Sequence, residues 1–457
     1  MFSYDNADTI AAIATPPGDG GIAIVRISGP QSFEIADRIF LCRGDKPSVR
    51  TGGTFTFGSI IFHNDILDAG LCLFMRGPKS FTGDDTVELQ VHGGTVLTRR
   101  ILQAAIDAGA RLAEPGEFTC RAFLNGKMDL VQAEAVLDAI RAKTDCAARA
   151  AIQQLEGTLS KRFSSIYDHI MKLAVDIQAS MDFPDEELPE VVLPDIAERL
   201  CSVEAEISEM LKTWNEGKFL RDGAMIVIAG RPNAGKSTLM NALLGKDRAI
   251  VSQYPGTTRD VIEDWLMIEG IAARLMDTAG LRDSECEIEK QGVAKAKKQL
   301  EQADLYLYVI DGSTGIHRDD LQYLTDLDAR KRIIVLNKID LGLVAKRDLP
   351  ESETIAISLL RGDSLDPLRR KITERLLTGK VTRDHVGTIS DRHRELLISA
   401  KRELNEALKI LASSGEYGLV IAADQIREAL EHLGRVTGRI YENELLNSIF
   451  SRFCIGK

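Results

Sequence analysis

The chain has 457 residues, about three times the usual size of one domain, so two or three domains are expected. Hydrophobic residues make up 44% and charged residues 27% of the chain, values that exclude a disordered or fibrous protein. The net charge of -11 provides no general attraction for nucleic acid, so any contact with RNA has to use local basic clusters.

The cysteines and the apolar segments bear on the cellular compartment. Seven cysteines are present, an odd number without a CxxC pair, which argues against a disulfide framework and favours a reducing environment. The N-terminus lacks the basic and then apolar pattern of a signal peptide, and no run of about 18 apolar residues could span a bilayer. We expect a cytoplasmic protein without a membrane partner.

The first 120 residues combine short apolar runs with glycine-rich turns. The pattern predicts strands at residues 22–27 and 71–74 and a helix at residues 95–108. It is typical of a small α+β domain, which we place at residues 1–120.

Helical spacing begins near residue 129. Apolar residues recur every three or four positions in one run over residues 152–177 and in another over residues 196–214. The spacing resumes after residue 390, and we expect such stripes to form a core. The helices flank a block of different character, which predicts an α/β domain at residues 221–378 inserted into an all-α domain made of residues 121–220 and 379–457.

The inserted block starts with a phosphate-binding loop. A predicted strand at residues 225–229 leads into GRPNAGKS at residues 230–237, which fits GxxxxGK[ST] and precedes a helix. Backbone N–H groups of such a loop surround phosphates, Lys236 places a catalytic positive charge on the β- and γ-phosphates, and Ser237 offers its hydroxyl to Mg²⁺. GTP contacts are expected from Asn233, Ala234, Gly235, Lys236, Ser237 and Thr238.

A second motif, DTAG at residues 277–280, follows a predicted strand. Asp277 can hold Mg²⁺ through water, and Gly280 can donate its N–H to the γ-phosphate. Thr258 lies between the two motifs, where a second hydroxyl ligand of Mg²⁺ belongs. Contacts with GTP are expected from Ser252, Gln253, Tyr254, Pro255, Gly256, Thr257, Thr258, Asp277, Thr278, Ala279 and Gly280.

A third motif, NKID at residues 337–340, follows another predicted strand and indicates the base. Asp340 can accept both hydrogens of the guanine N1–H and exocyclic amine, which adenine cannot supply, so GTP rather than ATP is predicted. Asn337 and Lys338 are the other expected contacts of this motif. Ser358 marks a weaker fifth segment, because Leu359 and Leu360 follow it where GTPases commonly have alanine, and its contact with the base is left open.

The residue that positions the attacking water is not evident from the motifs. Many small GTPases use a glutamine directly after DxxG, but this chain has Leu281 there. Nearby acids are Asp283, Glu285, Glu287 and Glu289, and no arginine finger is identifiable by spacing. Charge neutralisation is therefore expected from a partner or an additional cation.

Two basic clusters are the candidate RNA contacts, although solvated helix faces explain each cluster better on its own. They comprise Arg369, Arg370, Lys371, Arg375, Lys380 and Arg383, and then Arg392, Arg394, Lys401 and Arg402.

Further motifs cover the rest of the chain: ATPPG at residues 14–18, GGIAIVRISG at 20–29, SFTGDDTVELQVHGG at 80–94, EPGEFT at 114–119, RAFLNGK at 121–127 and the terminal CIGK. With these motifs the chain resembles the MnmE (TrmE) family of bacterial tRNA-modification GTPases over essentially its whole length. The resemblance implies a homodimer joined through the N-terminal domains. It also implies action on tRNA, rather than DNA, with a flavin-dependent partner called MnmG or GidA. Together they add an aminomethyl or carboxymethylaminomethyl group at carbon 5 of the wobble uridine.

The resemblance implies a 5-formyltetrahydrofolate site, or a site for a related one-carbon folate, in the N-terminal domain. Arg26, Glu88, Lys127 and Lys457 match the folate contacts by position, although the residues alone favour ordinary surface charges. Cys454 could act as a nucleophile on pyrimidine carbon 6, but we favour a structural or folate-facing tail, because no base is identifiable near the thiol.

The resemblance also implies how the missing glutamine and arginine are replaced. K⁺ would promote pairing of two GTPase domains and take the place of an arginine, held by Asn233, Ser252, Tyr254 and Thr257. Glu289 matches the catalytic acid that orients water through a second water. A regulatory switch in ribosome assembly or signalling is the alternative, which the GTPase motifs alone do not exclude.

Overall fold

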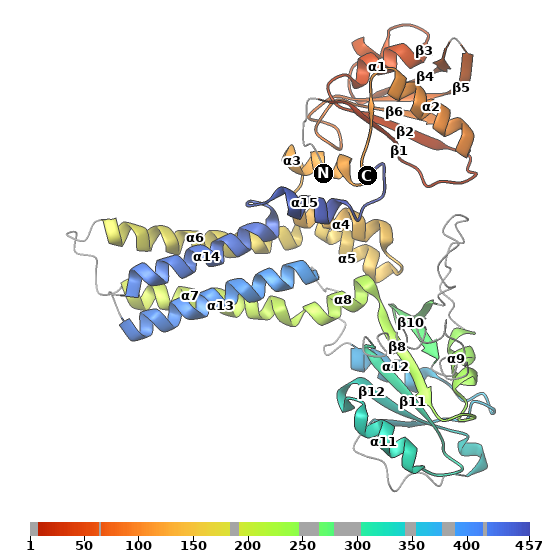
Figure 1. Cartoon of the computed structure of the whole chain (residues 1–457), viewed down its shortest axis with the longest axis vertical. Coiled ribbons are helices and arrows are strands. Elements are labelled where there is room, and N and C mark those ends of the chain that lie inside the picture. Colours follow the sequence, from red (N-terminus) through yellow and green to blue (C-terminus); the bar gives the residue numbers. More distant parts are fainter. Residues whose placement is uncertain are drawn as a thin grey trace, which may run out of the picture.

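The computed structural model describes residues 8–63, 65–182, 192–245, 265–277, 303–342, 353–376, 389–414 and 418–457. An N-terminal sheet and a second sheet lie at opposite ends of the molecule, with a helical bundle between them (Figure 1). The chain leaves the bundle through α8 (Trp214–Asp222) and returns at α13 (Asp391–Ser414), so the second sheet is inserted into the bundle. The expected fold class is confirmed.

The N-terminal sheet has seven strands in the order β3-β4-β5-β6-β2-β1-β7. Helices α1 and α2 cover one face, where alternate strand residues such as Val25, Ile27 and Leu89 are fully buried. The strands and the helix expected in this region are present. The elements are β1 (Ile10–Ile13), β2 (Ala23–Ser28), α1 (Ser32–Ile39), β3 (Phe40–Cys42), η1 (Pro47–Val49), β4 (Thr54–Phe62), β5 (Asp65–Met75), β6 (Thr86–Val91), α2 (Thr95–Asp107) and β7 (Arg111–Leu112).

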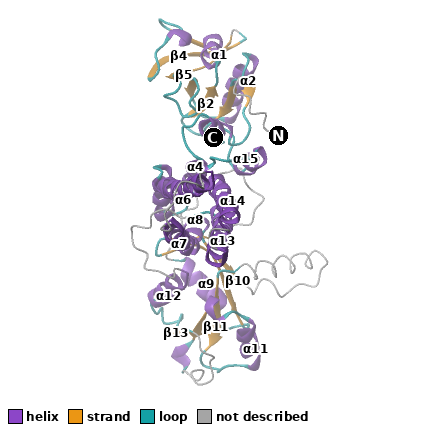
Figure 2. Cartoon of the chain, turned by 90° about the vertical axis from the view of Figure 1, so that its left-hand side faces the viewer, coloured by secondary structure: helices purple, strands orange, loops and turns teal. Residues whose placement is uncertain are grey.

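The bundle packs its long helices around one apolar core, and Figure 2 shows them nearly end-on between the two sheets. The single helix expected over residues 152–177 is wrong. The chain breaks at Gly157, which has a left-handed φ of 82°, and Ile152 on the preceding helix is 50% exposed. The helices are α3 (Glu117–Leu124), α4 (Leu130–Arg141), α5 (Asp145–Leu155), α6 (Thr158–Asp182), α7 (Val192–Lys212), α14 (Leu419–Thr437) and α15 (Asn443–Phe450), with α8 and α13.

The second sheet has six strands in the order β13-β12-β11-β8-β10-β9, and all its pairs are parallel except that of β9 with β10. Apolar side chains of α9 and α12 pack on one face and those of α11 on the other, which explains the continuous apolar runs of the central strands. The elements are β8 (Ala224–Gly230), α9 (Lys236–Leu244), β9 (Trp265–Ile268), β10 (Ile271–Asp277), β11 (Leu305–Asp311), α11 (Arg318–Asp326), η3 (Ala329–Lys331), β12 (Arg332–Asn337), η4 (Ile339–Leu341), β13 (Thr354–Ala356) and α12 (Asp366–Leu376).

The C-terminal tail returns to the N-terminal sheet, and the end of the chain lies beside this sheet in Figure 1. Gly456 has a φ of 95°, and a Cβ there would come within 2.4 Å of the Ile13 carbonyl oxygen. Only glycine therefore allows the tail to lie this close to β1. The last residues thus belong structurally to the N-terminal domain.

Candidate functional site

The phosphate loop connects β8 to α9 at the carboxyl edge of the parallel strands, where ligands of such sheets bind. Its backbone takes left-handed φ values at Asn233 (63°) and Gly235 (102°). A Cβ on Gly235 would come within 2.1 Å of Asn337 Nδ2, so glycine is required there. Lys236 is buried, and its Nζ donates to the Arg231 carbonyl oxygen at 2.8 Å, which places the ammonium inside the loop. Ser237 and Thr238 are exposed on the first turn of α9.

The NKID segment contacts the phosphate loop directly. Asn337 Nδ2 donates to the Ala234 carbonyl oxygen at 3.0 Å, and Asn337 Oδ1 accepts from the Leu359 N–H at 3.3 Å. Lys338 Nζ donates to the Asn233 carbonyl oxygen at 2.7 Å. The two predicted motifs therefore form one site, joined at consecutive residues of the phosphate loop.

Asp340 is oriented by Ser358. The fully buried Ser358 hydroxyl donates to Asp340 Oδ1 at 2.5 Å, and this hydrogen bond holds the pKa of the Asp340 carboxyl below its ordinary value. Ser358 is fixed in turn by Asp363, whose Oδ2 accepts the Ser358 N–H at 2.7 Å. The structure thus shows that Ser358 orients the carboxylate of Asp340, whereas the sequence left open only whether Ser358 contacts the base.

Sequence reasoning missed Asp311 and Asp363. Asp311 ends β11 and pairs in register with Asn337 at the end of β12. Its Oδ2 lies 2.7 Å from Lys338 Nζ, and its Oδ1 accepts from the Ser313 N–H and hydroxyl at 3.0 and 2.6 Å. The sequence did contain a signal for Asp311, since it is a polar residue directly after the apolar run of β11. This position lies at the same edge of the sheet as the motifs.

Asp277 ends β10 in register with Ile228 of the adjacent β8, so its backbone lies at the same sheet edge as the phosphate loop. The other expected residues of the phosphate, magnesium and potassium sites lie outside the described residues. They are Ser252, Gln253, Tyr254, Pro255, Gly256, Thr257, Thr258, Thr278, Ala279, Gly280 and Glu289.

A second polar cluster lies in the N-terminal domain. Arg26 on β2 faces Glu88 on β6, with Arg26 Nε 2.7 Å from Glu88 Oε1. The same guanidinium donates to the Gly456 carbonyl oxygen at 3.4 Å and lies 5.5 Å from the centre of the Phe118 ring. Burial and the nearby Arg26 lower the pKa of Lys457, against the opposing effect of Glu88. The structure therefore brings together Arg26, Glu88 and the terminal Lys457.

Lys127 and Cys454 lie close to this cluster. Lys127 Nζ donates to the Pro78 carbonyl oxygen at 2.8 Å, in the same segment as Phe81, whose ring centre is 5.7 Å from the Arg26 guanidinium carbon. The exposed Cys454 accepts the Gly116 N–H with its backbone carbonyl oxygen at 3.4 Å, which fixes the start of the tail.

Lys380 and Arg383 of the first basic cluster lie outside the described residues, and most of the remaining basic side chains of the two clusters pair with carboxylates. Glu353 lies within 3.0 Å of Lys371 and 3.2 Å of Arg375, while Arg392 binds Glu134 at 2.7 Å. Lys401 lies 2.9 Å from Glu204. These pairs support the interpretation of the clusters as ordinary helix faces.

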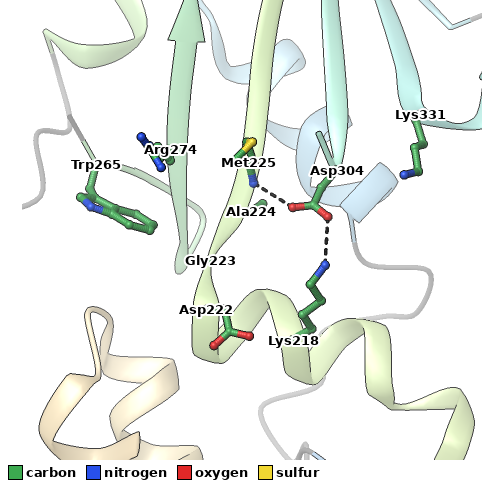
Figure 3. A pocket seen from close by; sticks show the side chains of 9 residues that line it. All are labelled: Lys218, Asp222, Gly223, Ala224, Met225, Trp265, Arg274, Asp304 and Lys331. Carbon is green, nitrogen blue, oxygen red and sulfur yellow. Dashed lines mark hydrogen bonds and ion pairs between the residues drawn. The ribbon is translucent and has the colours of Figure 1, made fainter. Parts of the chain in front are cut away.

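A cavity of about 540 Å³ lies where α8 meets β8 (Figure 3). It is at the amino ends of the parallel strands, opposite the phosphate loop, so it is not the nucleotide site. Lys218 and Asp304 form an ion pair of 3.3 Å across it. The lining residues are Lys218, Asp222, Gly223, Ala224, Met225, Trp265, Arg274, Asp304 and Lys331.

The fold and the joined phosphate and NKID loops define a P-loop GTPase. The family model described as "GTP-binding protein TrmE N-terminus" matches residues 9–127, and the one described as "MnmE helical domain" matches residues 130–454. The chain belongs to the MnmE family of tRNA modification GTPases. Proteins named "tRNA modification GTPase MnmE" from Geobacter metallireducens, Acetivibrio thermocellus and Geobacter sulfurreducens are 42%, 40% and 41% identical to it, each over 98% of this chain and 99% of the relative.

Across the described ranges, no helix combines the length and apolar character needed to cross a membrane.

Proposed function

We propose that this protein hydrolyses GTP to drive domain movements in a complex that modifies tRNA in the cytoplasm. With the flavoprotein MnmG (GidA), it would add an aminomethyl or carboxymethylaminomethyl group at carbon 5 of the wobble uridine. The observation that carries the proposal is the convergence of Arg26, Glu88 and the C-terminal tail in a domain separate from the GTPase site. A regulatory switch requires only the nucleotide site, so a second polar site that includes the C-terminal tail favours an additional function.

The GTPase chemistry follows from the residues of the joined loops. Lys236 and the N-terminus of α9 would bind the phosphates, Ser237 and Thr258 would hold Mg²⁺, and Asp340 would select guanine. Mg²⁺ fits this site because Ser237 is exposed at the loop, and the ion would offset charge on the phosphates. Glu289 would orient the attacking water.

Potassium would complete the GTPase site when two GTPase domains pair. Asn233 is exposed at the phosphate loop and its carbonyl is fixed by Lys338, which suits a residue that contributes to a cation site. Ser252, Tyr254 and Thr257 would supply the remaining ligands. K⁺ beside the bridge between the β- and γ-phosphates would offset the negative charge that develops there.

The N-terminal cluster fits a one-carbon folate such as 5-formyltetrahydrofolate. Glu88 can accept hydrogen bonds from a pterin ring, and the cations of Arg26, Lys127 and Lys457 can pair with a glutamate tail. Lys457 is half-buried beside the positive charge of Arg26, which disfavours its own charged form. An anion bound there would offset the two positive charges. Cys454 would belong to the structural tail of this site.

The homodimer would form through the open face of the N-terminal sheet. Phe55 and Phe57 on β4 are 67% and 66% exposed, and they face Leu73 and Leu71 of β5 in register. Such an apolar patch on the face opposite α1 and α2 suits a second copy of the chain.

Chromatographic analysis of tRNA nucleosides from a deletion strain tests the function. We expect the modified wobble uridines to disappear and to return with the wild-type gene. Unchanged nucleosides would leave the regulatory switch as the function.

A further inference from the structure

Asp311 occupies a position between the two halves of the nucleotide site. It ends β11, the strand that separates β8, which leads into the phosphate loop, from β12, which leads into NKID. The register places Val309 beside Gly230 and Asp311 beside Asn337. Asp311 therefore lies at the same edge of the sheet as both loops, although neither motif includes it.

Both oxygens of the Asp311 carboxylate have hydrogen-bond partners, one of which is Lys338. Asp311 Oδ2 lies 2.7 Å from Lys338 Nζ, while Oδ1 accepts two hydrogen bonds from Ser313. The side chains of Lys338 and Asp311 are 33% and 20% exposed, so solvent screens this pair incompletely. Burial raises the pKa of Asp311, but the hydrogen bonds from Lys338 and Ser313 outweigh it and lower the pKa, which keeps the carboxyl ionised.

The second contact of Lys338 is with the phosphate loop. Its ammonium donates to the Asn233 carbonyl oxygen at 2.7 Å, and both Lys338 and Asn233 have left-handed backbones, with φ of 62° and 63°. Left-handed non-glycine residues persist where their surroundings hold them. A neutral carbonyl cannot balance a partly buried ammonium, so Asp311 supplies the charge that keeps Lys338 in this bridge.

We propose that Asp311 is a positioning residue for guanine nucleotides, which acts through Lys338 to hold the phosphate loop against the base-binding loop. This inference rests on the proposed nucleotide site. It predicts that loss of the Asp311 charge weakens GTP and GDP binding by a similar factor, because both nucleotides share the base and the two inner phosphates. It also predicts that Asp311 has no effect once Lys338 is removed.

The test measures dissociation constants of fluorescent GDP and GTP analogues for full-length wild type, Asp311→Asn, Lys338→Met and the double variant. Ser313→Ala is the matched control, because it removes a hydrogen bond to the same carboxylate and leaves the pair with Lys338. We expect Asp311→Asn to weaken binding by about tenfold or more, as for a lost hydrogen bond to a charged group, and Ser313→Ala by less than about threefold. The double variant should bind like Lys338→Met alone.

Additive effects of Asp311→Asn and Lys338→Met, or an unchanged affinity in Asp311→Asn, would overturn the inference. If Asp311→Asn does not fold, judged by circular dichroism, Asp311→Ser serves in its place, since it retains an acceptor without the charge. Failure of the wild type to bind either nucleotide would instead refute the nucleotide site itself.

Discussion

Ser358 donates its hydroxyl hydrogen to the carboxylate of Asp340, and through this contact the loop after β13 orients the residue that we propose selects guanine. The Ser358→Ala variant should leave Asp340 in place but free to rotate. We expect GTP affinity to fall by about three- to tenfold, because the Asp340 carboxylate keeps its contact with the base and loses only the hydrogen bond that orients it. Equilibrium titration with a fluorescent GTP analogue measures the change. Thr354→Ala on the same segment is a control, and equal losses in both variants would contradict a specific role for Ser358.

Hydrolysis should depend on Glu289 and on the type of monovalent cation. Glu289→Ala should remove most turnover while leaving nucleotide affinity intact, because in the proposed mechanism the acid orients water and does not hold the nucleotide. Asp283→Ala is the matched control and should retain turnover. Phosphate release measured in K⁺ and then in Na⁺ should show slower turnover in Na⁺. Equal rates in the two salts would refute the potassium mechanism, and full activity of Glu289→Ala would remove that residue from it.

The open face of the N-terminal sheet should decide the oligomeric state. Phe57→Glu places a charge in the middle of the apolar patch of β4 and β5, where burial without a partner is unfavourable. We expect the wild type to be a dimer and the variant a monomer at the same concentration, measured by light scattering coupled to size exclusion. Val420→Glu, at an apolar position of α14 that is 60% exposed, is the control and should remain dimeric. A dimeric Phe57→Glu variant would place the interface elsewhere.

Asp138 on α4 should make stability depend on pH. Burial raises the pKa of Asp138 to about 6, with Arg221 opposing and Glu134 adding to the shift. Between the unfolded pKa of about 4 and the folded pKa of about 6, Asp138 is protonated in the folded chain and ionised in the unfolded chain, so folding takes up a proton. The stability that this difference contributes is lost as pH rises through the range.

Asp138→Asn should accordingly raise the free energy of unfolding by about 1–2 kcal/mol at pH 7.5 and have little effect at pH 4.5. Thermal unfolding at the two pH values measures this difference. A stabilisation that is the same at both values would show that it does not come from ionisation of Asp138, and a loss of stability at pH 7.5 would show that Arg221 holds Asp138 ionised.

The sequence predicted elements well where one physical rule dominates. The phosphate loop was predictable because glycine positions and the following helix follow from phosphate binding alone, and Gly235 has the positive φ that this requires. The break at Gly157 was missed because apolar spacing continues across it, and Ile152 matches the stripe by count although it is half-exposed on a separate helix, α5. The roles of Ser358 and Asp311 depend on pairing between strands far apart in sequence, which periodicity does not encode.

The chain passes twice between the bundle and the GTPase domain, and the two crossings are joined at the bundle. The indole N–H of Trp214, at the exit, donates to Asp391 Oδ1 at 2.9 Å, at the return. A domain that is attached through two neighbouring connections can rotate about the line between them as a hinge, but it cannot rotate freely as a domain on one linker can. The insertion therefore attaches the GTPase domain to the bundle at two points that are in direct contact, which hinders rotation of that domain about either connection alone.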